Sequence, residues 1–196
     1  MTWSPGRIAL VVGAILLLST PIRVNAAGGL LTQSDAPPGF GTLHSKAYTT
    51  WVRKMKVVTQ TKGMGKGASS CDVLKAYKRD GWSRGMIQAF DSPGLLNIFE
   101  LCENVFASTA GSQKAYATAA SELTKAAAKV KGMKPIPGTA IGDSSEGVFA
   151  VQGGFINAEM LFRHGTAVVV MIYLGGSQFT GTAFVQTAQR ANRRIP

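Results

Sequence analysis

The chain has 196 residues, of which 45% are hydrophobic, and it carries 21 Lys and Arg residues against 10 Asp and Glu residues. This hydrophobic content excludes a chain that is disordered throughout, and the length fits a single domain with a substantial core. The net charge of +11 favours anionic partners through long-range attraction.

Residues 1–26 have the layout of a secretory signal peptide. Arg7 precedes an apolar run, Ile8–Leu18, and Val24-Asn25-Ala26 supplies small residues for cleavage after Ala26. A retained membrane anchor is the alternative, although a run of 11 residues is shorter than the roughly 20 that a spanning helix needs. We therefore expect a secreted protein that acts outside the cell or in the cell envelope, with no transmembrane segment in the mature chain.

The positive charge is concentrated in one stretch. Ten basic residues and two acidic residues lie between Lys46 and Arg84, so this stretch carries +8. Such density predicts contact with an anionic polymer or surface, such as a wall polymer, lipid head groups or released nucleic acid. The alternative is a solvated basic face. The predicted contact residues for the anionic partner are Lys54, Lys56, Lys62 and Lys66.

The two cysteines, Cys71 and Cys102, predict a structural disulfide, because an even pair in a small secreted domain is typical of one. Two free buried thiols or a redox pair are the alternatives, but redox pairs usually lie close together in the sequence. Closing this loop would contribute roughly 3–4 kcal/mol to stability.

The first half of the mature chain is expected to begin with an extended segment, residues 27–45, rich in Gly and Pro. A single domain, residues 46–196, follows. The apolar pattern of Lys46–Lys62 fits a helix or a strand equally well. Beyond it the sequence predicts a short helix and two strands, which are Cys71–Lys78, Ser83–Phe90 and Leu95–Phe106.

The second half is expected to contain two amphipathic helices and a hairpin. The helices are Ser112–Lys131 and Phe179–Ile195, and the hairpin strands are Gly154–Arg163 and Thr166–Leu174, with a further strand at Val148–Val151. A two-residue turn at His164-Gly165 would pair Phe162 with Ala167 and keep one apolar face. The predicted fold class is α+β, an antiparallel sheet with packed helices in an α/β sandwich.

Residues 142–147 are the strongest candidate for a hydrolase site, and the pattern fails. A nucleophile elbow needs Gly-x-Ser-x-Gly, and Glu146 stands two residues after Ser144. A serine nucleophile also needs a base, and the chain has only His44 and His164. We therefore expect a turn leading into a strand, with Asp143 bonded to local amides, and no catalytic residue.

Metal and cofactor sites are not expected either. Two separated histidines and ten scattered acids offer no convergent ligand set, and Asp143 with Glu146 comes closest to a carboxylate cluster. Residues 63–70 resemble a phosphate-binding loop in composition only, because Gly67 follows Lys66 where Ser or Thr is required.

Several short motifs together resemble a known family. They are Leu31–Phe40, Gly81-Trp82 at the start of a strand, Ile141-Gly142-Asp143, and Phe162–Thr166 before an apolar strand and an amphipathic helix. This pattern resembles the secreted sensor-like domains of actinobacterial receptor kinases and related lipoproteins, with a PsbP/Mog1-like fold. The resemblance implies an α/β sandwich with a ligand-binding or regulatory role and no catalysis. It assigns no site residue.

The functional hypothesis from the sequence is a secreted, non-enzymatic binding or sensor-like module at the cell surface, with a basic face for anionic partners. Such a module would hold a small apolar ligand in a cleft that contains no nucleophile–base pair. One alternative is a small secreted serine hydrolase, which would need Ser144 or Ser145 beside a histidine. The other is an adhesive protein that binds anionic polymers.

Overall fold

A computed structural model of the chain describes residues 29–51, 75–91, 97–136 and 140–196. The predicted signal peptide, Cys71 and the four lysines predicted to contact an anionic partner lie outside the described residues.

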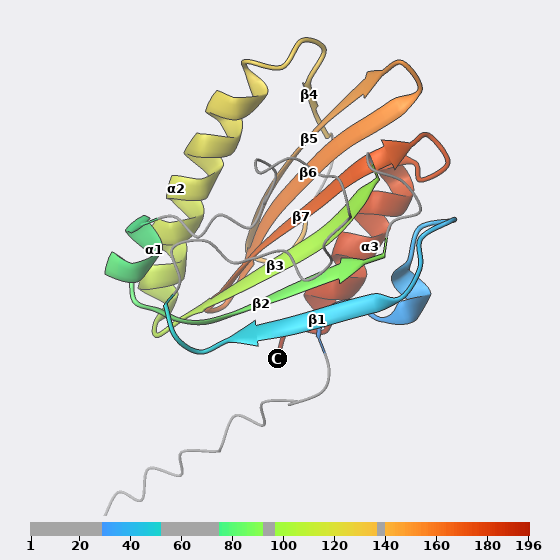
Figure 1. Cartoon of the computed structure of the whole chain (residues 1–196). Helices are drawn as coiled ribbons and strands as arrows, with labels where there is room; N and C mark the ends of the chain where they lie inside the picture. The colour runs from blue at the N-terminus through green and yellow to red at the C-terminus, as the bar shows by residue number, and fades with distance from the viewer. Residues whose placement is uncertain (1–28, 52–74, 92–96, 137–139) are drawn as a thin grey trace, which may run out of the picture.

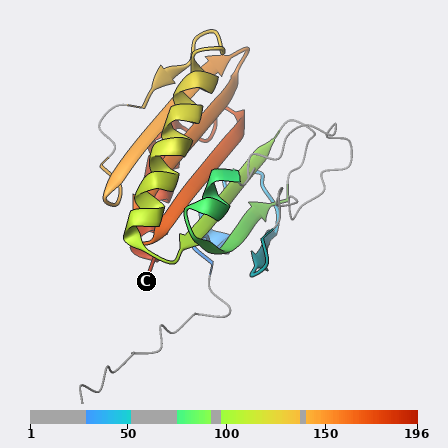
Figure 2. The ribbon, with the colours of Figure 1, turned by 90° about the vertical axis from the view of Figure 1, so that its left-hand side faces the viewer.

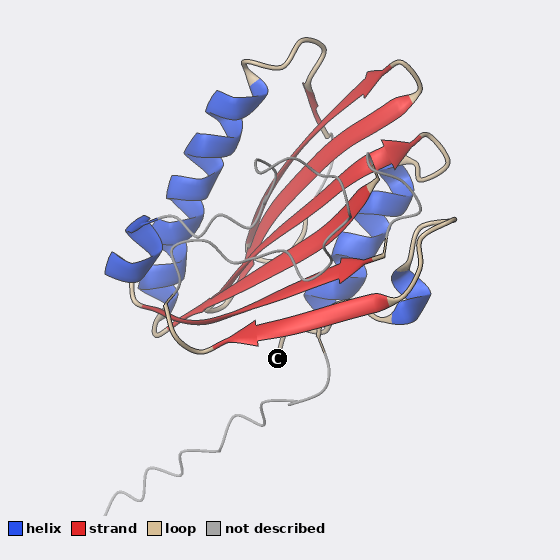
Figure 3. Ribbon diagram, in the orientation of Figure 1, coloured by secondary structure: helices blue, strands red, loops and turns tan. Residues whose placement is uncertain are grey.

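A single antiparallel sheet of seven strands dominates the described residues, in the order β1-β2-β3-β7-β6-β5-β4 (Figures 1 and 3). Each strand is antiparallel to its neighbours. The strands are β1 (Leu43–Tyr48), β2 (Trp82–Phe90), β3 (Ile98–Phe106), β4 (Lys134–Pro135), β5 (Ser144–Gln152), β6 (Phe155–His164) and β7 (Ala167–Gly176).

Helices cover both faces of this sheet, which confirms the predicted α+β fold class (Figure 2). One face, called here the α2 face, packs against α1 (Lys75–Arg79) and α2 (Thr109–Ala127). The other, the α3 face, packs against α3 (Gly181–Arg193) and a short 3₁₀ turn, η1 (Gln33–Asp35). None of the helices in the described ranges is long and apolar enough to cross a membrane.

Alternating side chains divide the core between the two faces, as the period of a strand requires. In β3, Phe99 and Leu101 belong to the cluster on the α3 face, whereas Cys102 and Phe106 belong to the cluster on the α2 face. Phe99 is fully buried and lies at the centre of an aromatic group. Its ring neighbours are Phe40, Phe90, Tyr173, Phe179 and Phe184.

Helix α2 begins three residues before the predicted start and ends four residues before the predicted end. Ser108 is the N-cap, and its side chain accepts a hydrogen bond from the Gly111 N–H at 3.1 Å. Ser112, which was expected to open the helix, lies inside it and is fully buried. Its hydroxyl donates to the Gly165 carbonyl at 2.7 Å, so it ties α2 to the β6–β7 turn.

The β6–β7 hairpin has the predicted faces but a different register. Phe162 pairs with Val169 rather than with Ala167, and the two-residue turn is Gly165-Thr166 rather than His164-Gly165. A shift of two residues leaves every side chain on its predicted face, so the apolar pattern cannot distinguish the two registers. Gly165 has φ 53°, which favours glycine at the first turn position.

The N-terminal segment contributes to the core before β1 begins. Leu30 and Leu31 are 3% and 2% exposed. The Gln88 side chain of β2 accepts a hydrogen bond from the Leu31 N–H at 2.8 Å and donates to the Leu31 carbonyl at 3.1 Å. This amide satisfies the Leu31 backbone as a neighbouring strand would, so the segment predicted to be extended packs against the sheet.

Candidate ligand pocket

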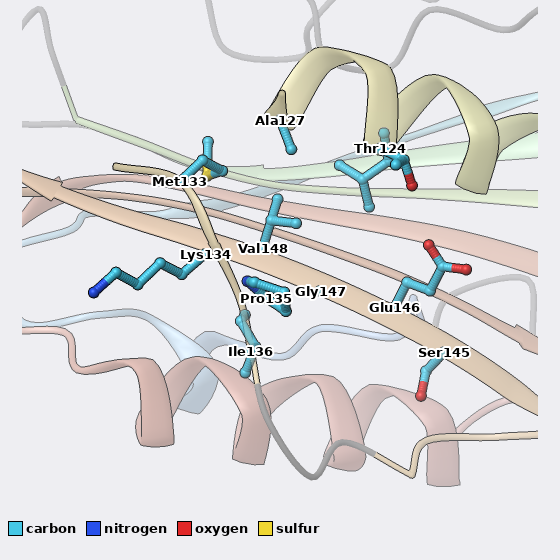
Figure 4. A pocket seen from close by; sticks show the side chains of 11 residues that line it. Thr124, Ala127, Met133, Lys134, Pro135, Ile136, Ser145, Glu146, Gly147 and Val148 are labelled. Carbon is cyan, nitrogen blue, oxygen red and sulfur yellow. The ribbon is translucent and has the colours of Figure 1, made fainter. Parts of the chain in front are cut away.

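A pocket of about 340 Å³ opens at the β4–β5 edge of the sheet, beneath the C-terminal half of α2 (Figure 4). Its lining comes from three consecutive parts of the chain. These are Leu123, Thr124 and Ala127 of α2, then Met133, Lys134, Pro135 and Ile136 around β4, and Ser145, Glu146, Gly147 and Val148 of β5.

The short edge strand β4 explains why a pocket forms here. Lys134 pairs with Phe149 and Pro135 pairs with Val148, and the Ile136 N–H donates a hydrogen bond to the Gly147 carbonyl at 2.8 Å. Proline has no N–H to donate, which confines it to the edge of a sheet. This edge of the sheet is therefore formed by a strand of two residues, Lys134–Pro135, which covers only part of β5.

Glycine at position 147 allows the outer wall to close against the core. A Cβ at this position would lie 2.9 Å from Met160 Cε and 3.0 Å from Ile136 Cδ1. Both distances are shorter than ordinary van der Waals contact, so Met160 and Ile136 occupy the space that a larger residue would need.

The charged side chains of the pocket lie at opposite ends, with an apolar wall between them. In Figure 4, Lys134 lies at one end and Glu146 at the other, and Val148 points toward Ala127 of α2. Lys134 and Glu146 are exposed, whereas Leu123 is only 5% exposed. An apolar cleft with a few separated polar groups is the usual form of a small-molecule site.

A partly buried carboxyl group lies beside Val148 of this wall. Glu159 of β6 is paired with Val148 of β5, so the two side chains share the α2 face. Burial raises the pKa of Glu159 to about 7. Tyr77 of α1 is affected by the same carboxyl, because burial first, and then the charges of Asp80 and Glu159, raise the pKa of its phenol. Perturbed groups of this kind gather at functional sites more often than elsewhere.

Asp143 has a structural role, but its partner is not the local one that the sequence suggested. Its Oδ2 accepts a hydrogen bond from the Gly165 N–H at 2.9 Å and pairs with Arg163 at 2.8 Å. The Arg163 guanidinium is buried and also donates to the Gly165 carbonyl at 3.0 Å. The carboxylate thus joins the start of β5 to the β6–β7 turn.

Burial raises the pKa of Tyr116 in α2 to about 12, and the negative charge of Glu146 adds to this effect while Arg163 opposes it. Glu146 therefore acts electrostatically on α2 as well as lining the pocket. The sequence had singled out this residue only as one of two carboxylates in a weak cluster.

The serines expected in a hydrolase site are engaged in other contacts. The Ser144 hydroxyl donates to the Asp143 carbonyl at 2.8 Å, and Ser145 Oγ accepts from the Ile141 N–H at 3.1 Å. The ring of His164 bonds to Asn192 Oδ1 at 3.0 Å, and the ring of His44 bonds to Asp91 Oδ2 at 3.0 Å. Within the described part of the chain, neither histidine is hydrogen-bonded to a serine.

The structure describes only some of the other residues that were predicted to form sites. Cys102 is buried in β3 on the α2 face, and its predicted disulfide partner Cys71 lies outside the described residues. Lys54, Lys56, Lys62 and Lys66 also lie outside them, so the anionic-partner site stays a prediction. In residues 29–51, 75–91, 97–136 and 140–196, no three His, Cys, Asp or Glu side chains form a group that could hold a metal ion.

The sequence does not predict the pocket. Leu123 lies in the predicted helix Ser112–Lys131 and Val148 begins the predicted strand Val148–Val151, but no pattern indicates that the two side chains face one cavity. The short interval between the end of the predicted helix and Pro135 indicates that the chain turns back toward the sheet soon after the helix. It does not indicate which strand the returning segment pairs with.

Comparisons with known proteins identify a similar solved structure. No family model and no curated protein matches the chain. The structure of the extracellular domain of PknH from Mycobacterium tuberculosis is similar, with 12% sequence identity, coverage of 79% of this chain and 87% of that chain, and a TM-score of 0.47.

Proposed function

We propose that the protein is a non-enzymatic binding module that acts at the cell surface and holds a small, largely apolar ligand with one anionic group. The observation that carries this proposal is the pocket between α2 and β4–β5. Its volume of about 340 Å³ falls within the range of roughly 300–1,000 Å³ that is usual for small-molecule sites. The expected action outside the cell rests on the N-terminal segment of the sequence.

The charges of the pocket support one orientation of such a ligand. The Lys134 ammonium would attract an anionic group at its end, and the Glu146 carboxylate would repel one at the other end. The apolar part would then lie against Met133, Ala127 and Val148. With a pKa of about 7, the Glu159 carboxyl beside Val148 is mostly neutral at pH values well below 7, where it adds no fixed negative charge near that wall.

A fluorescent probe with this chemistry tests the site. Anilinonaphthalene sulfonate combines fused aromatic rings with one sulfonate, and its emission rises in apolar surroundings. We expect it to bind the parent protein. Ala127→Trp should abolish this binding, because the indole would fill the pocket from α2. Ala117→Trp is the matched control, since Ala117 is an exposed residue of the same helix and does not line the pocket.

The charge of the pocket is tested separately. Lys134→Gln should weaken binding of the probe about tenfold, which is the lower end of the roughly 1.5–3 kcal/mol of a charge-assisted hydrogen bond, because Lys134 is exposed. Lys114→Gln removes the same charge from the first half of α2 and should leave binding unchanged. Equal probe binding by the parent and the Ala127→Trp variant would reject the pocket as the ligand site.

A further inference from the structure

Two large apolar side chains are exposed at one hairpin, where a monomeric fold would be expected to bury them. Val151 is 59% exposed and Phe155 is 42% exposed, and they are the exposed large hydrophobic residues of the described ranges. Both flank the turn that joins β5 to β6. The two side chains lie on opposite faces of the hairpin, because Val151 pairs with Ile156 of the α3-face cluster and Phe155 pairs with Gln152, so together they mark the end of the hairpin and not one face of the sheet. Single exposed apolar residues are common, but two at one hairpin end next to a charged segment indicate a contact surface.

The backbone of the β5–β6 hairpin fixes the positions of Val151 and Phe155 at its end. Gln152 pairs with Phe155, and the two-residue turn Gly153-Gly154 has φ values of 56° and 81°. Positive φ at both positions is the geometry of the tight hairpin turn that matches the twist of the strands. Nine residue pairs precede this turn along β5 and β6, so the apolar tip is a fixed feature of the sheet.

A basic turn lies beside this tip. The Gln152 side chain donates a hydrogen bond to the Lys131 carbonyl at 2.6 Å, which ties the hairpin to the α2–β4 connection. Lys129, Lys131 and Lys134 of that connection are exposed. Together, residues 129–134 and 151–155 form what we call the docking end.

The docking end carries no opposing charge of its own. No acidic residue occurs in residues 128–136 or 147–157. The acid Asp91, which follows β2, lies three strands from β6 in the sheet order and is paired with His44. The docking end therefore combines exposed apolar side chains with uncompensated positive charge.

We propose that the docking end binds the surface of an anionic lipid bilayer, with Val151 and Phe155 entering the interfacial region and the lysines contacting lipid phosphates. A bilayer interface offers anionic groups above apolar chains, which matches this pairing of charge and apolar area. A soluble polyanion would use the lysines but would leave the apolar tip in water. The docking end shares Met133 and Lys134 with the pocket, so its test uses Lys129, Lys131 and Phe155, which do not line the pocket.

Vesicle co-sedimentation tests this surface with protein purified from the cells that export it, so that its natural N-terminus is kept. We expect stronger binding to vesicles that contain phosphatidylglycerol than to vesicles of phosphatidylcholine alone. Replacing Lys129 and Lys131 with Gln should lower the partition coefficient about fivefold for each lysine, because one basic residue near an anionic surface contributes about 1 kcal/mol. Phe155→Ser should lower it about tenfold, from lost apolar burial.

The matched control replaces Lys114 and Arg193 with Gln, which removes the same charge from the first half of α2 and from the last turn of α3, outside the basic segment and the docking end. This control should bind as the parent does. If it loses as much binding as the Lys129 and Lys131 variant, the attraction comes from net charge alone and the proposal fails. If Phe155→Ser binds normally while dextran sulfate competes with the vesicles, the surface recognises polyanions, and the proposal fails as well. Thermal unfolding of each variant verifies that the fold is intact.

Discussion

Arg194, at the C-terminal end of α3, donates a hydrogen bond to Asp35 of η1 across 159 residues of sequence, with 2.6 Å between Nη1 and Oδ2. Arg190 adds a second bond, from Nε to the other carboxylate oxygen at 2.8 Å. The Asp35 side chain is only 1% exposed. This ion cluster fastens the N-terminal segment to α3 and closes that edge of the core on the α3 face.

Asp35→Asn should destabilise the protein by about 3 kcal/mol, because it removes the negative charge that two partly buried guanidinium groups share. The free energy of unfolding in urea measures this loss. Asp91→Asn provides the control, since the Asp91 side chain is 52% exposed and its pair with His44 should contribute less than about 1 kcal/mol. Equal losses in the two variants would contradict a special role for the buried cluster.

The same cluster predicts acid sensitivity. The pKa of Asp35 is lowered from 3.8 to about 2, because its hydrogen bonds from Arg194, Thr32 and Arg190 outweigh the effect of burial. Its stabilisation is therefore complete above pH 4 and is lost as the pH falls toward 2. Between these pH values the parent should lose more stability than Asp35→Asn.

Glu159 should give the opposite pH dependence. Burial raises its pKa from 4.5 to about 7, so the folded protein holds this proton more tightly than the unfolded chain. The resulting stability is complete below pH 4.5 and is lost as the pH rises through 7. Glu159→Gln should remove this loss, which is at most about 3 kcal/mol between pH 5 and 8.

Urea unfolding of the parent and the Glu159→Gln variant at pH 5 and pH 8 measures that difference. Glu122→Gln serves as the control, because Glu122 lies on the exposed side of α2 with its carboxylate paired to Lys125. A parent whose stability is the same at both pH values would show that Glu159 does not titrate as proposed.

Gly142 is required where the chain passes under β6. Its φ is +63°, and a Cβ would overlap the carbonyl oxygen of Arg163. Gly142→Ala should therefore cost more than the roughly 1 kcal/mol of a left-handed backbone alone. Gly132→Ala isolates the backbone effect, since Gly132 has φ +80° and nothing within 4 Å of its Cβ position. The midpoint of thermal unfolding should be clearly lower for Gly142→Ala than for Gly132→Ala.

The Cys71–Cys102 disulfide stays a prediction. Tyr77 of α1 packs against Phe106 of β3, with 5.3 Å between ring centroids, on the face that also carries Cys102. We expect no labelled thiol in the non-reduced, denatured protein. Cys71→Ser should cost roughly 2–5 kcal/mol. Two labelled thiols per chain would refute the bond.

The basic segment predicts a salt-sensitive affinity for polyanions. Replacing Lys54, Lys56, Lys62 and Lys66 with Gln should lower the salt concentration that elutes the protein from a polyanion column, because fewer counterions are released on binding. The fold should be unchanged. A control replaces Lys114, Lys125 and Arg193 with Gln, because these exposed residues lie outside both the basic segment and the docking end. If the first variant elutes with the parent, the basic segment is a solvated face only.

The amino-acid sequence by itself determined the local structure of most of the domain. Alternation of side chains between two faces predicted the strands β3 and β6, because a residue's face in a strand depends on its position along the strand. The apolar stripe of residues 179–195 likewise predicted α3, although Thr180 caps the helix and moves its start to Gly181. These signals concern residues close in the sequence, whose relative positions follow from the regular geometry of a helix or strand.

Only the tertiary structure decided the register of the β6–β7 hairpin, the partner of Asp143 and the pocket. Two registers that differ by two residues bury the same side chains, and the choice falls to contacts such as the one from Ser112 to Gly165. The pocket exists because α2 and the short strand β4 meet at the edge of β5. These relationships join residues far apart in the sequence. Their energies depend on packing between elements, which no local pattern of residues records.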